Sequence, residues 1–376
     1  MSEITPFTVD VSDADLEDLR RRLRGARWPD QLPDAGWDYG AEMGYIKELA
    51  RYWAEEYDWR AAEAELNELD HYTTTIDGQN IHFIHQRSPH PDAYPLVISH
   101  GWPGTVVEFL DIIGLLTHPD DPADAFHVVA PSLPGYGFSG PTSDRGWDAV
   151  RTAQAFAQLM GRLGYERYGA QGGDWGSFIS QNIGRCDPDR CEAVHVNFLF
   201  ATAPEDGPGE LTEAEQAGLA RANLYFTEGA GYMQIQSTKP QTLAYGLTDS
   251  AVGQLAWIAE KFLAWTDNDG TIESAVSRDR LLTNISLYWF TATAGSSARM
   301  YYEVLRPGAT GITEPLDSPI GVANFPMEIM RAPRRWLEDS YNIVHWSEMA
   351  EGGHFAAMEE PEALAQDIRQ FFGRFR

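Results

Sequence analysis

Residues 172–176 read Gly-Gly-Asp-Trp-Gly, a pattern that places a nucleophile between small residues where a strand turns into a helix. Asp174 holds the central position, in which serine is more usual. Such a turn forces strained backbone angles, and the flanking glycines have no Cβ to clash. Residues 167–171 are typical of a short strand, and residues 177–183 of a helix start. A carboxylate that attacks carbon forms an ester and needs a leaving group, so it suits epoxides or alkyl halides better than amides.

Hydrolysis of that ester needs a base to activate water, and His354 is the candidate. It follows two glycines after the last predicted strand, and a nucleophile followed by a late histidine is the chain order of α/β-hydrolases. A carboxylate must orient this base and stabilise its charged form. Glu328 follows the preceding strand, while Asp317, Asp339 and Glu314 are rivals that the spacing alone does not exclude.

A second loop is predicted to complete the site. Residues 100–104 read His-Gly-Trp-Pro-Gly and follow the predicted strand 95–99. We expect the amide hydrogens of Trp102 and Trp175 to point at the carbonyl oxygen of an Asp174 ester, as an oxyanion hole does. The Trp102 side chain also suits the wall of a pocket, and the two roles are compatible.

Around these motifs the chain alternates between strand and helix patterns. Polar, glycine-rich loops follow the strands, and a parallel α/β sheet places its site at such strand ends. We therefore predict an α/β-hydrolase fold. Its predicted strands cover residues 95–99, 126–130, 167–171, 320–324 and 342–346, and its predicted helices include 152–163 and 356–371.

The pattern divides the chain into three parts. Residues 1–94 are predicted to form an N-terminal extension of helices followed by a hairpin. Residues 95–199 and 316–376 form the core, and residues 200–315, rich in aromatic side chains at helical spacing, form a helical cap. The extension is predicted to contain a helix capped by Ser12 with Asp15, helices around residues 43–53 and 61–69, and strands 72–76 and 81–84 on either side of Asp77 and Gly78.

These motifs resemble those of the microsomal-type (juvenile-hormone-type) epoxide hydrolases of the α/β-hydrolase superfamily. The resemblance implies Asp174 as nucleophile, His354 as base and Glu328 as the acid that orients it. It extends from the N-terminal helices to the C-terminus, and its last two motifs are the most specific. The matching stretches are residues 100–104, 172–176, 231–240, 325–328 and 352–357.

The resemblance also implies two cap tyrosines that hydrogen-bond the epoxide oxygen. Tyr232 matches the first, and Tyr301 the second, although Tyr302 is adjacent and stays an alternative. A phenol can donate to this oxygen as the C–O bond breaks and then take the proton back. The chain begins without the hydrophobic anchor of membrane-bound relatives, so membrane residence is not expected to carry over.

The charge and cysteine content of the chain limit the classes of partner and cofactor that we expect. The 376 residues carry 56 acidic and 28 basic side chains, a net charge of −28, which argues against a nucleic acid or an anionic membrane surface as partner. Cys186 and Cys191 are the only cysteines, too few for a zinc set, and we expect no metal or organic cofactor. A cytoplasmic protein is expected, with a homodimer left open. Nearly all positive charge is arginine, which suggests a bacterial source.

The sequence therefore predicts an epoxide hydrolase that uses water to convert an apolar, bulky or aryl epoxide into a vicinal diol, in detoxification or secondary-metabolite biosynthesis. A haloalkane dehalogenase shares the fold and the aspartate, but it needs halide-stabilising N–H groups, of which Trp175 supplies one, rather than paired phenols. A non-catalytic binder of an apolar epoxide or terpenoid has no need of Asp174, Glu328 and His354 together. A serine esterase is disfavoured because the sequence contains no Gly-x-Ser-x-Gly.

Overall fold

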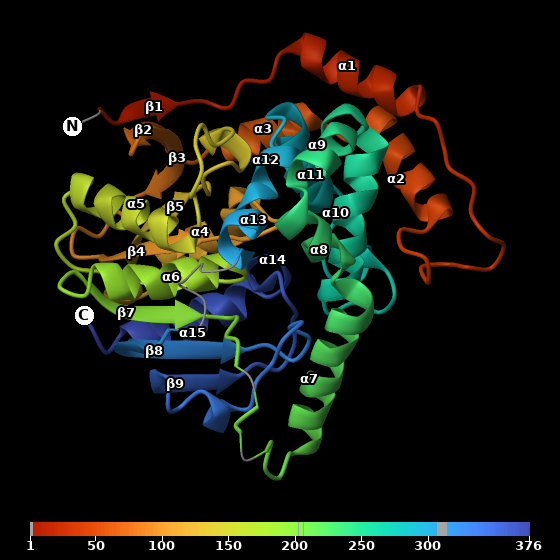
Figure 1. The fold of residues 1–376 in the computed structure, drawn as a ribbon. Helices are drawn as coiled ribbons and strands as arrows, with labels where there is room; N and C mark the ends of the chain where they lie inside the picture. Colours follow the sequence, from red (N-terminus) through yellow and green to blue (C-terminus); the bar gives the residue numbers. More distant parts are fainter. Residues whose placement is uncertain (1–2, 202, 206, 307–313) are drawn as a thin grey trace.

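The computed structural model describes residues 3–201, 203–205, 207–306 and 314–376. Within them, nine strands form a sheet in the order β1-β2-β3-β5-β4-β6-β7-β8-β9 (Figure 1). Strands β5, β4, β6, β7, β8 and β9 run parallel, whereas β1, β2 and β3 pair antiparallel. The strands are β1 (Thr5–Phe7), β2 (His71–Ile76), β3 (Gln79–Gln86), β4 (Tyr94–Ser99), β5 (Phe126–Pro131), β6 (Tyr168–Gly172), β7 (Cys191–Val196), β8 (Leu316–Asn324) and β9 (Tyr341–Glu348).

The predicted hairpin is confirmed. Asp77 and Gly78 have φ angles of 51° and 77°, and a tight two-residue hairpin turn requires this left-handed backbone. Because β3 pairs with β5, the hairpin extends the core sheet across residue 94. The division into extension, core and cap stays a prediction. Its boundary at residue 94 falls between strands that belong to one continuous sheet.

Helices cover both faces of the sheet, as an α/β fold requires (Figure 1). Helices α5 and α6 contact each other on one face, and α4 and α15 contact each other on the other face. The core helices are α4 (Leu110–Thr117), α5 (Ala149–Arg162), α6 (Trp175–Cys186), α14 (Ala356–Glu359) and α15 (Pro361–Phe372), with short 3₁₀ turns η1 (Val106–Phe109), η2 (Pro122–Asp124), η3 (Gly137–Ser139) and η6 (Arg334–Trp336).

The prediction of one closing helix over residues 356–371 is wrong. The segment forms two helices, α14 and α15, and the break lies at Glu360, whose φ and ψ angles are −135° and 58°. Pro361 explains the break, because its ring excludes the helical conformation from the residue before it. The break places a short helical turn directly after His354.

Strand β7, which the sequence analysis did not identify, has a polar residue in a buried position. His195 is fully buried, and its Nε2 lies 2.9 Å from Oδ2 of Asp367 in α15. Oδ1 of the same carboxylate lies 2.8 Å from His345 Nε2 in β9. A histidine interrupts the apolar run that indicates a buried strand, and a partner remote in sequence satisfies it here.

The cap follows β7 and precedes β8, and it lies at the carboxyl ends of the parallel strands (Figure 1). Its elements are α7 (Glu213–Leu224), the π-helical turn η4 (Tyr225–Gly229), α8 (Gly231–Thr238), α9 (Pro240–Asp249), α10 (Ala251–Trp265), η5 (Ile272–Ser274), α11 (Arg278–Phe290), α12 (Ala294–Ser297) and α13 (Arg299–Leu305). Residues 202, 206 and 307–313 of the predicted cap, like residues 1–2, lie outside the described residues. Among the described helices, none has both the length and the apolar character needed to cross a membrane.

The N-terminal extension joins the core sheet to the cap. Its helices are α1 (Asp13–Arg24), α2 (Met43–Glu55) and α3 (Trp59–Leu66). Strand β1 pairs at the edge of the sheet, whereas α1 and α2 contact α10, and α3 contacts α11. Arg22 Nη1 lies 3.0 Å from Asp249 Oδ1 of the cap, and Trp53 Nε1 donates to Ser286 Oγ over 2.9 Å. The cap is therefore held from outside as well as by its own connections to the core.

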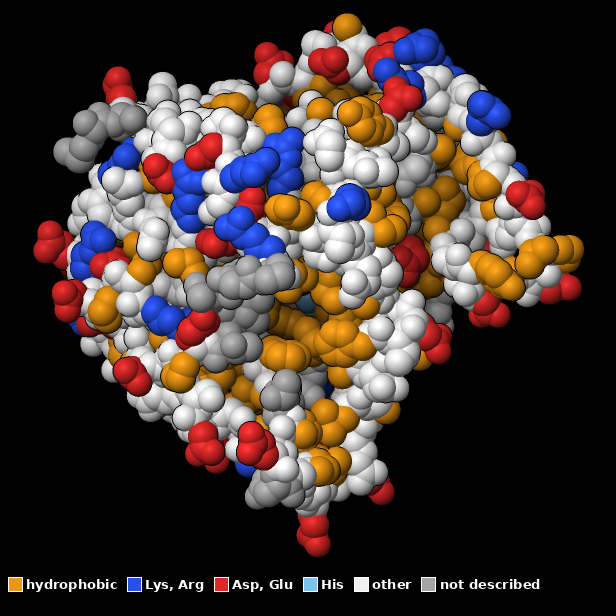
Figure 2. Space-filling model, in the orientation of Figure 1, with side chains coloured by type: hydrophobic (Ala, Val, Ile, Leu, Met, Phe, Trp, Pro, Cys, Tyr) orange, Lys and Arg blue, Asp and Glu red, His pale blue; other side chains and the backbone are white. Residues whose placement is uncertain are grey.

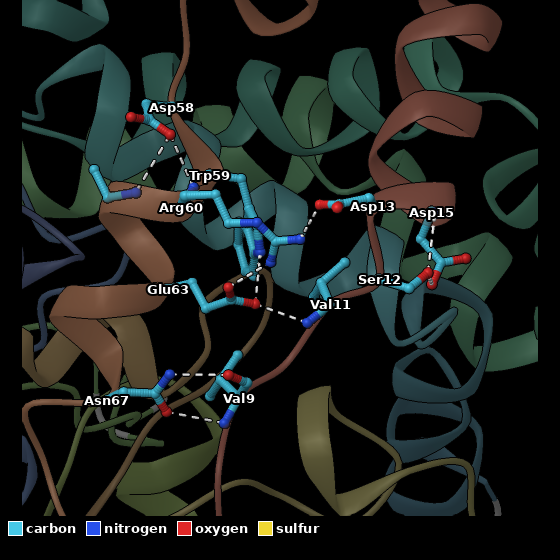
Figure 3. A network of polar contacts seen from close by, with 11 residues as sticks. Val9, Val11, Ser12, Asp13, Asp15, Asp58, Trp59, Arg60, Glu63 and Asn67 are labelled. Carbon is cyan, nitrogen blue, oxygen red and sulfur yellow. Dashed lines mark hydrogen bonds and ion pairs between the residues drawn. The ribbon is translucent and has the colours of Figure 1, made fainter.

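Figure 3 shows how α3 holds the segment between β1 and α1. The Asn67 side chain accepts from the Val9 amide and donates to the Val9 carbonyl, each over 2.9 Å. Glu63 Oε1 accepts from the Val11 amide over 2.7 Å and from Trp59 Nε1 over 3.1 Å. These side chains replace the partners that a neighbouring strand would offer this extended backbone.

The same contacts correct the predicted third helix, which was placed at residues 61–69. The helix begins earlier because Asp58 caps it, accepting from the amides of Arg60 and Ala61 (Figure 3). It ends at Leu66, and the next residue, Asn67, turns its side chain to Val9.

Candidate active site

Asp174 lies at the predicted turn between a strand and a helix. Strand β6 ends at Gly172 and α6 begins at Trp175, so Asp174 is the N-cap of that helix. Its φ angle of 49° is in the left-handed region, which confirms the expected backbone strain. A Cβ on Gly176 would lie 1.8 Å from the Ser99 carbonyl oxygen at the end of β4. Glycine is therefore needed for the helix to approach the sheet this closely and lift Asp174 above the strand ends.

The structure brings Asp174, His354 and Glu328 together at the carboxyl edge of the sheet. His354 Nε2 lies 3.2 Å from Asp174 Oδ2, and His354 Nδ1 lies 2.7 Å from Glu328 Oε1. Among the four carboxylates considered from the sequence, Glu328 is the one that contacts the imidazole, and it is only 2% exposed. Its Oε1 also accepts from the Ile329 amide over 2.7 Å. Asp317 lies in the exposed part of β8.

The two carboxylates control the charge of the base. Burial lowers the pKa of His354, but the negative charges of Glu328 and Asp174 outweigh burial and hold this pKa well above its usual value. At neutral pH this shift favours the imidazolium form of His354 between the two carboxylates. Removal of either negative charge would lower its pKa and favour the neutral base.

The loop that carries His354 is fixed by a second carboxylate, that of the half-buried Glu359. Glu359 in α14 accepts from the amides of Gly353 and Phe355 over 3.0 and 2.8 Å. Burial nevertheless raises the pKa of Glu359 to about 7. A Cβ on Gly353 would lie 2.6 Å from the Trp265 carbonyl oxygen, which explains the glycine before His354.

A backbone donor lies at the expected place. The Trp102 amide donates to Asp174 Oδ1 over 2.9 Å. Trp175 is the first residue of α6, where amide hydrogens have no carbonyl partner within the helix. Helix α11 of the cap fixes the Trp102 loop, because Asn284 Nδ2 donates to the Pro103 carbonyl oxygen over 2.8 Å. Oδ1 is thus held by an N–H group, which leaves Oδ2 beside His354.

Asp174 faces an apolar cavity of about 210 Å³ between core and cap. Figure 2 shows this face of the molecule hollowed near its centre, with hydrophobic side chains around the hollow. Apart from Asp174, the lining is apolar or aromatic: Trp175, Phe178, Phe198, Phe200, Tyr225, Phe226, Tyr232, Met233, Tyr301, Leu305, Ile329 and Met330. One carboxylate in an apolar cavity is a common arrangement for a small-molecule site.

Both cap tyrosines line this cavity. Tyr232 stacks on the Trp102 ring with their centroids 4.8 Å apart, and Tyr301 meets the edge of Trp175 at 4.8 Å. Tyr301 is 2% exposed and lines the cavity, whereas Tyr302 is 42% exposed and does not. The structure thus separates the two adjacent residues that the sequence left as alternatives. The Trp102 side chain is a support for Tyr232 while its amide contacts Asp174.

Glu108, which the sequence analysis did not single out, lies close behind the nucleophile. It follows Val107 in η1. Its carboxyl group lies against the backbone of Gly104, where a Cβ would be only 1.4 Å from Oε1, so only glycine fits at that position. The Gly101 amide donates to it, and burial raises its pKa to about 8, although the charge of His354 opposes this rise. The one signal in the sequence is a carboxylate that stands directly between two apolar residues, Val107 and Phe109.

We expect Glu108 to make the protein less stable as the pH rises. The unfolded chain ionises this carboxyl near pH 4.5, whereas the folded chain keeps it protonated up to about pH 8. Between these values the unfolded state binds fewer protons, so the free energy of unfolding falls with pH. Over this pH window, the free energy of unfolding of the Glu108→Gln variant should fall by about 2 kcal/mol less than that of the unmodified protein. The difference is smaller than the full pKa shift implies, because residual solvent access reduces the effect. Urea unfolding at several pH values measures the difference.

The matched control for this prediction is Glu68→Gln, which changes an exposed glutamate on the surface of the extension. Its unfolding free energies should run parallel to those of the unmodified protein. Identical slopes for the Glu108→Gln variant and the unmodified protein would contradict the expected ionisation of Glu108.

Comparison with known proteins agrees with this geometry. The family model described as epoxide hydrolase N terminus matches residues 4–109, and the model for the alpha/beta hydrolase fold matches residues 94–205. The chain is 46% identical to a relative in Stigmatella aurantiaca, over 99% of this chain and 86% of the relative. It is 39% identical to epoxide hydrolase 1 of Sus scrofa, over 98% of this chain and 88% of that protein. The chain belongs to the epoxide hydrolase family.

Solved structures of this family share the whole architecture. Juvenile hormone epoxide hydrolase from the silkworm Bombyx mori is 34% identical, with a TM-score of 0.94 over 100% of this chain and 95% of that one. Epoxide hydrolase from Aspergillus niger is 35% identical, with a TM-score of 0.90 over 99% and 96% of the two chains. The chain is thus an α/β-hydrolase-fold enzyme of the epoxide hydrolase class, which favours the predicted activity over a dehalogenase or a non-catalytic binder.

Proposed function

We propose that the protein hydrolyses an apolar, bulky or aryl epoxide to a vicinal diol through a covalent ester on Asp174. The observation that supports this proposal most directly is that Asp174, Tyr232 and Tyr301 line one apolar cavity. The carboxylate comes from the core and the two phenols from the cap, so an epoxide between them meets a nucleophile and two acids. A neighbouring apolar cavity of about 330 Å³ shares Phe200, Phe226 and Met330 with the first and gives room for a large substituent.

In the first step, Asp174 Oδ2 attacks a ring carbon and the C–O bond breaks. The bonding electrons move to the epoxide oxygen. This oxygen takes a proton from one phenol while the other phenol donates a hydrogen bond to it. Burial raises the pKa of Tyr232 and Tyr301 well above the usual value, so both keep their protons at neutral pH and can serve as acids. Asp174 Oδ1 becomes the ester carbonyl oxygen and keeps its hydrogen bond from the Trp102 amide.

In the second step, His354 activates water. Formation of the ester removes the negative charge of Asp174, which is one of the groups that raise the pKa of His354. The imidazolium therefore releases its proton, which restores the phenol, and becomes a neutral base. Water then attacks the ester carbonyl carbon while His354 takes a proton and Glu328 stabilises the imidazolium. The N–H groups of Trp102 and Trp175 stabilise the oxyanion of this tetrahedral intermediate. As it collapses, the ester C–O bond breaks and the leaving oxygen takes the second proton of the attacking water, which restores the Asp174 carboxylate and releases the diol.

A single turnover in ¹⁸O-labelled water tests the ester pathway. With enzyme in excess over an aryl epoxide such as styrene oxide, the new diol oxygen should come from the Asp174 carboxylate, so the first diol contains no label. The labelled oxygen should instead appear in the Asp174 peptide, as measured by peptide mass spectrometry. Label in the first diol and none in the peptide would show direct attack by water and would overturn the proposed mechanism.

The two cap tyrosines should act together. Tyr232→Phe or Tyr301→Phe alone should slow ester formation about tenfold, because one phenol still donates, and the double variant about 10³-fold. Stopped-flow fluorescence of the site tryptophans in single turnovers measures this step. Tyr302→Phe is the matched control, since this adjacent tyrosine is largely exposed and outside the cavity. A double variant that reacts as fast as either single variant would contradict the assignment.

A further inference from the structure

A third phenol touches the predicted oxygen site from the cap. The hydroxyl oxygens of Tyr225 and Tyr232 are 2.7 Å apart, and both rings line the cavity that contains Asp174. Tyr225 is 8% exposed, so this hydrogen bond is shielded from water. Neither the motifs in the sequence nor the mechanism proposed above uses Tyr225.

The backbone around Tyr225 is unusual. Tyr225 begins the π-helical turn that connects α7 to α8, and Gly229 ends it. Such turns are rare and are frequent at functional sites, because the extra residue redirects a side chain. Here the turn brings Tyr225 and Tyr232, seven residues apart, into hydrogen-bonding distance.

A buried lysine supports both ends of this arrangement. Lys261 in α10 is 4% exposed and forms an ion pair with Glu260. Its Nζ donates to the Gly229 carbonyl oxygen over 3.5 Å and lies 4.6 Å from the centroid of the Tyr232 ring. One cation therefore fixes the π-helical turn and the face of the tyrosine next to it.

We propose that Tyr225 is the outer donor of a proton relay, in which Tyr232 protonates the opening epoxide oxygen while it accepts a proton from Tyr225. This inference rests on the proposed function. When the C–O bond breaks, its electron pair forms an alkoxide, which takes the Tyr232 proton. The Tyr232 oxygen takes the proton of Tyr225, so the negative charge lies on Tyr225. The proton released by His354 after ester formation restores the phenol.

The environment of the pair favours charge on the outer phenol. Burial raises the pKa of both groups, that of Tyr225 to about 12 and that of Tyr232 well above its usual value. The hydrogen bond between them lowers the pKa of Tyr225 and raises that of Tyr232. The nearby negative charge of Asp174, which also raises both pKa values, disappears when the ester forms. The relay thus moves charge away from the more deeply buried oxygen.

The Tyr225→Phe variant tests the relay, because it keeps the ring and removes only the hydroxyl group. We expect ester formation in single turnovers with styrene oxide to slow about threefold, less than in Tyr232→Phe because Tyr232 still donates directly, with hydrolysis of the ester unchanged. In mixtures of H₂O and D₂O, the rate of ester formation should depend on two protons in the unmodified enzyme and on one in the variant. Tyr245→Phe, at a 73% exposed cap tyrosine, is the matched control.

A double-variant cycle separates the relay from a purely structural role. In the Tyr232→Phe background the relay is already broken, so Tyr225→Phe should cause no further slowing, whereas a packing defect would add to the loss. Equal rates and equal proton dependence in Tyr225→Phe and the unmodified enzyme would overturn the relay. If the ¹⁸O label reaches Asp174 while Tyr225→Phe has no effect, the relay alone fails. If no label reaches Asp174, the proposed function fails first.

Discussion

Diol formation should fall by ~10⁴-fold or more when Asp174 is replaced by alanine, because the variant has no nucleophile to form the ester. The rest of the site would remain: His354 and Glu328 still pair, and the Trp102 amide still points into the cavity. Those groups alone position neither an attacking atom nor a leaving group. Steady-state diol production from aryl epoxides measures the loss, with thermal unfolding to compare folding.

Two controls make this result interpretable. Asp189→Ala changes an exposed aspartate after α6 and should keep full activity. Alanine and aspartate both carry a Cβ at the strained φ angle of 49°, so we expect the melting temperature of the Asp174→Ala variant to stay close to that of the unmodified protein. Near-normal activity in a folded Asp174→Ala variant would mean that water attacks the epoxide directly, and the ester scheme would be abandoned.

The nucleophile turn was predictable because its cause is local. A Cβ on Gly172 would lie 2.2 Å from the Gly176 carbonyl oxygen, and Asp174 between them has the strained φ angle, so this constraint arises within five consecutive residues. Glu328 was different. Its distance along the chain from His354 fits several carboxylates, and only the fold shows which one lies 2.7 Å from the imidazole. The resemblance to a family, rather than spacing, made Glu328 the preferred candidate.

Features that depend on packing between remote segments escaped the sequence. Strand β7 was missed because His195 looks polar, although Asp367 from the last helix satisfies it in the core. Glu108 was missed because nothing in its apolar neighbours tells that its carboxyl group lies against Gly104. The sequence did not distinguish Tyr225 from the other aromatic residues of the cap, because a π-helical turn has no sequence pattern comparable to a capping box.

Trp102 connects the core chemistry to the cap. Its amide donates to Asp174, and its ring supports Tyr232 at 4.8 Å. Because α11 also holds the loop of Trp102 through Asn284, a shift of the cap would move the nucleophile's N–H donor and the epoxide's phenol donor together. The extension packs on the cap from outside. The described contacts therefore favour a fixed cap, which holds the Trp102 amide and the Tyr232 phenol in place relative to Asp174.

The His354→Gln variant should separate the two chemical steps. Asp174 and the cap phenols remain, so the ester should still form, but no base activates water and hydrolysis should slow by ~10⁴-fold. The ester should therefore accumulate after exposure to styrene oxide, other aryl epoxides or a set of alkyl halides. Intact-mass spectrometry detects it, and peptide mapping locates it. His118→Gln, at an exposed histidine after α4, should keep turnover and accumulate nothing.

The mass of the adduct identifies the reaction as well as the residue. An adduct with the mass of the whole epoxide on the Asp174 peptide supports ring opening by the carboxylate, since no atom leaves in that step. An adduct equal to a haloalkane less its hydrogen halide, with none from the epoxides, would instead favour the dehalogenase that Trp175 permits. A folded variant that gains no mass, beside an unmodified protein that makes no diol from the same epoxides, would contradict the proposed substrate class. The ester can accumulate only if Asp174 attacks before His354 activates water. Its formation therefore also tests the order of these two steps.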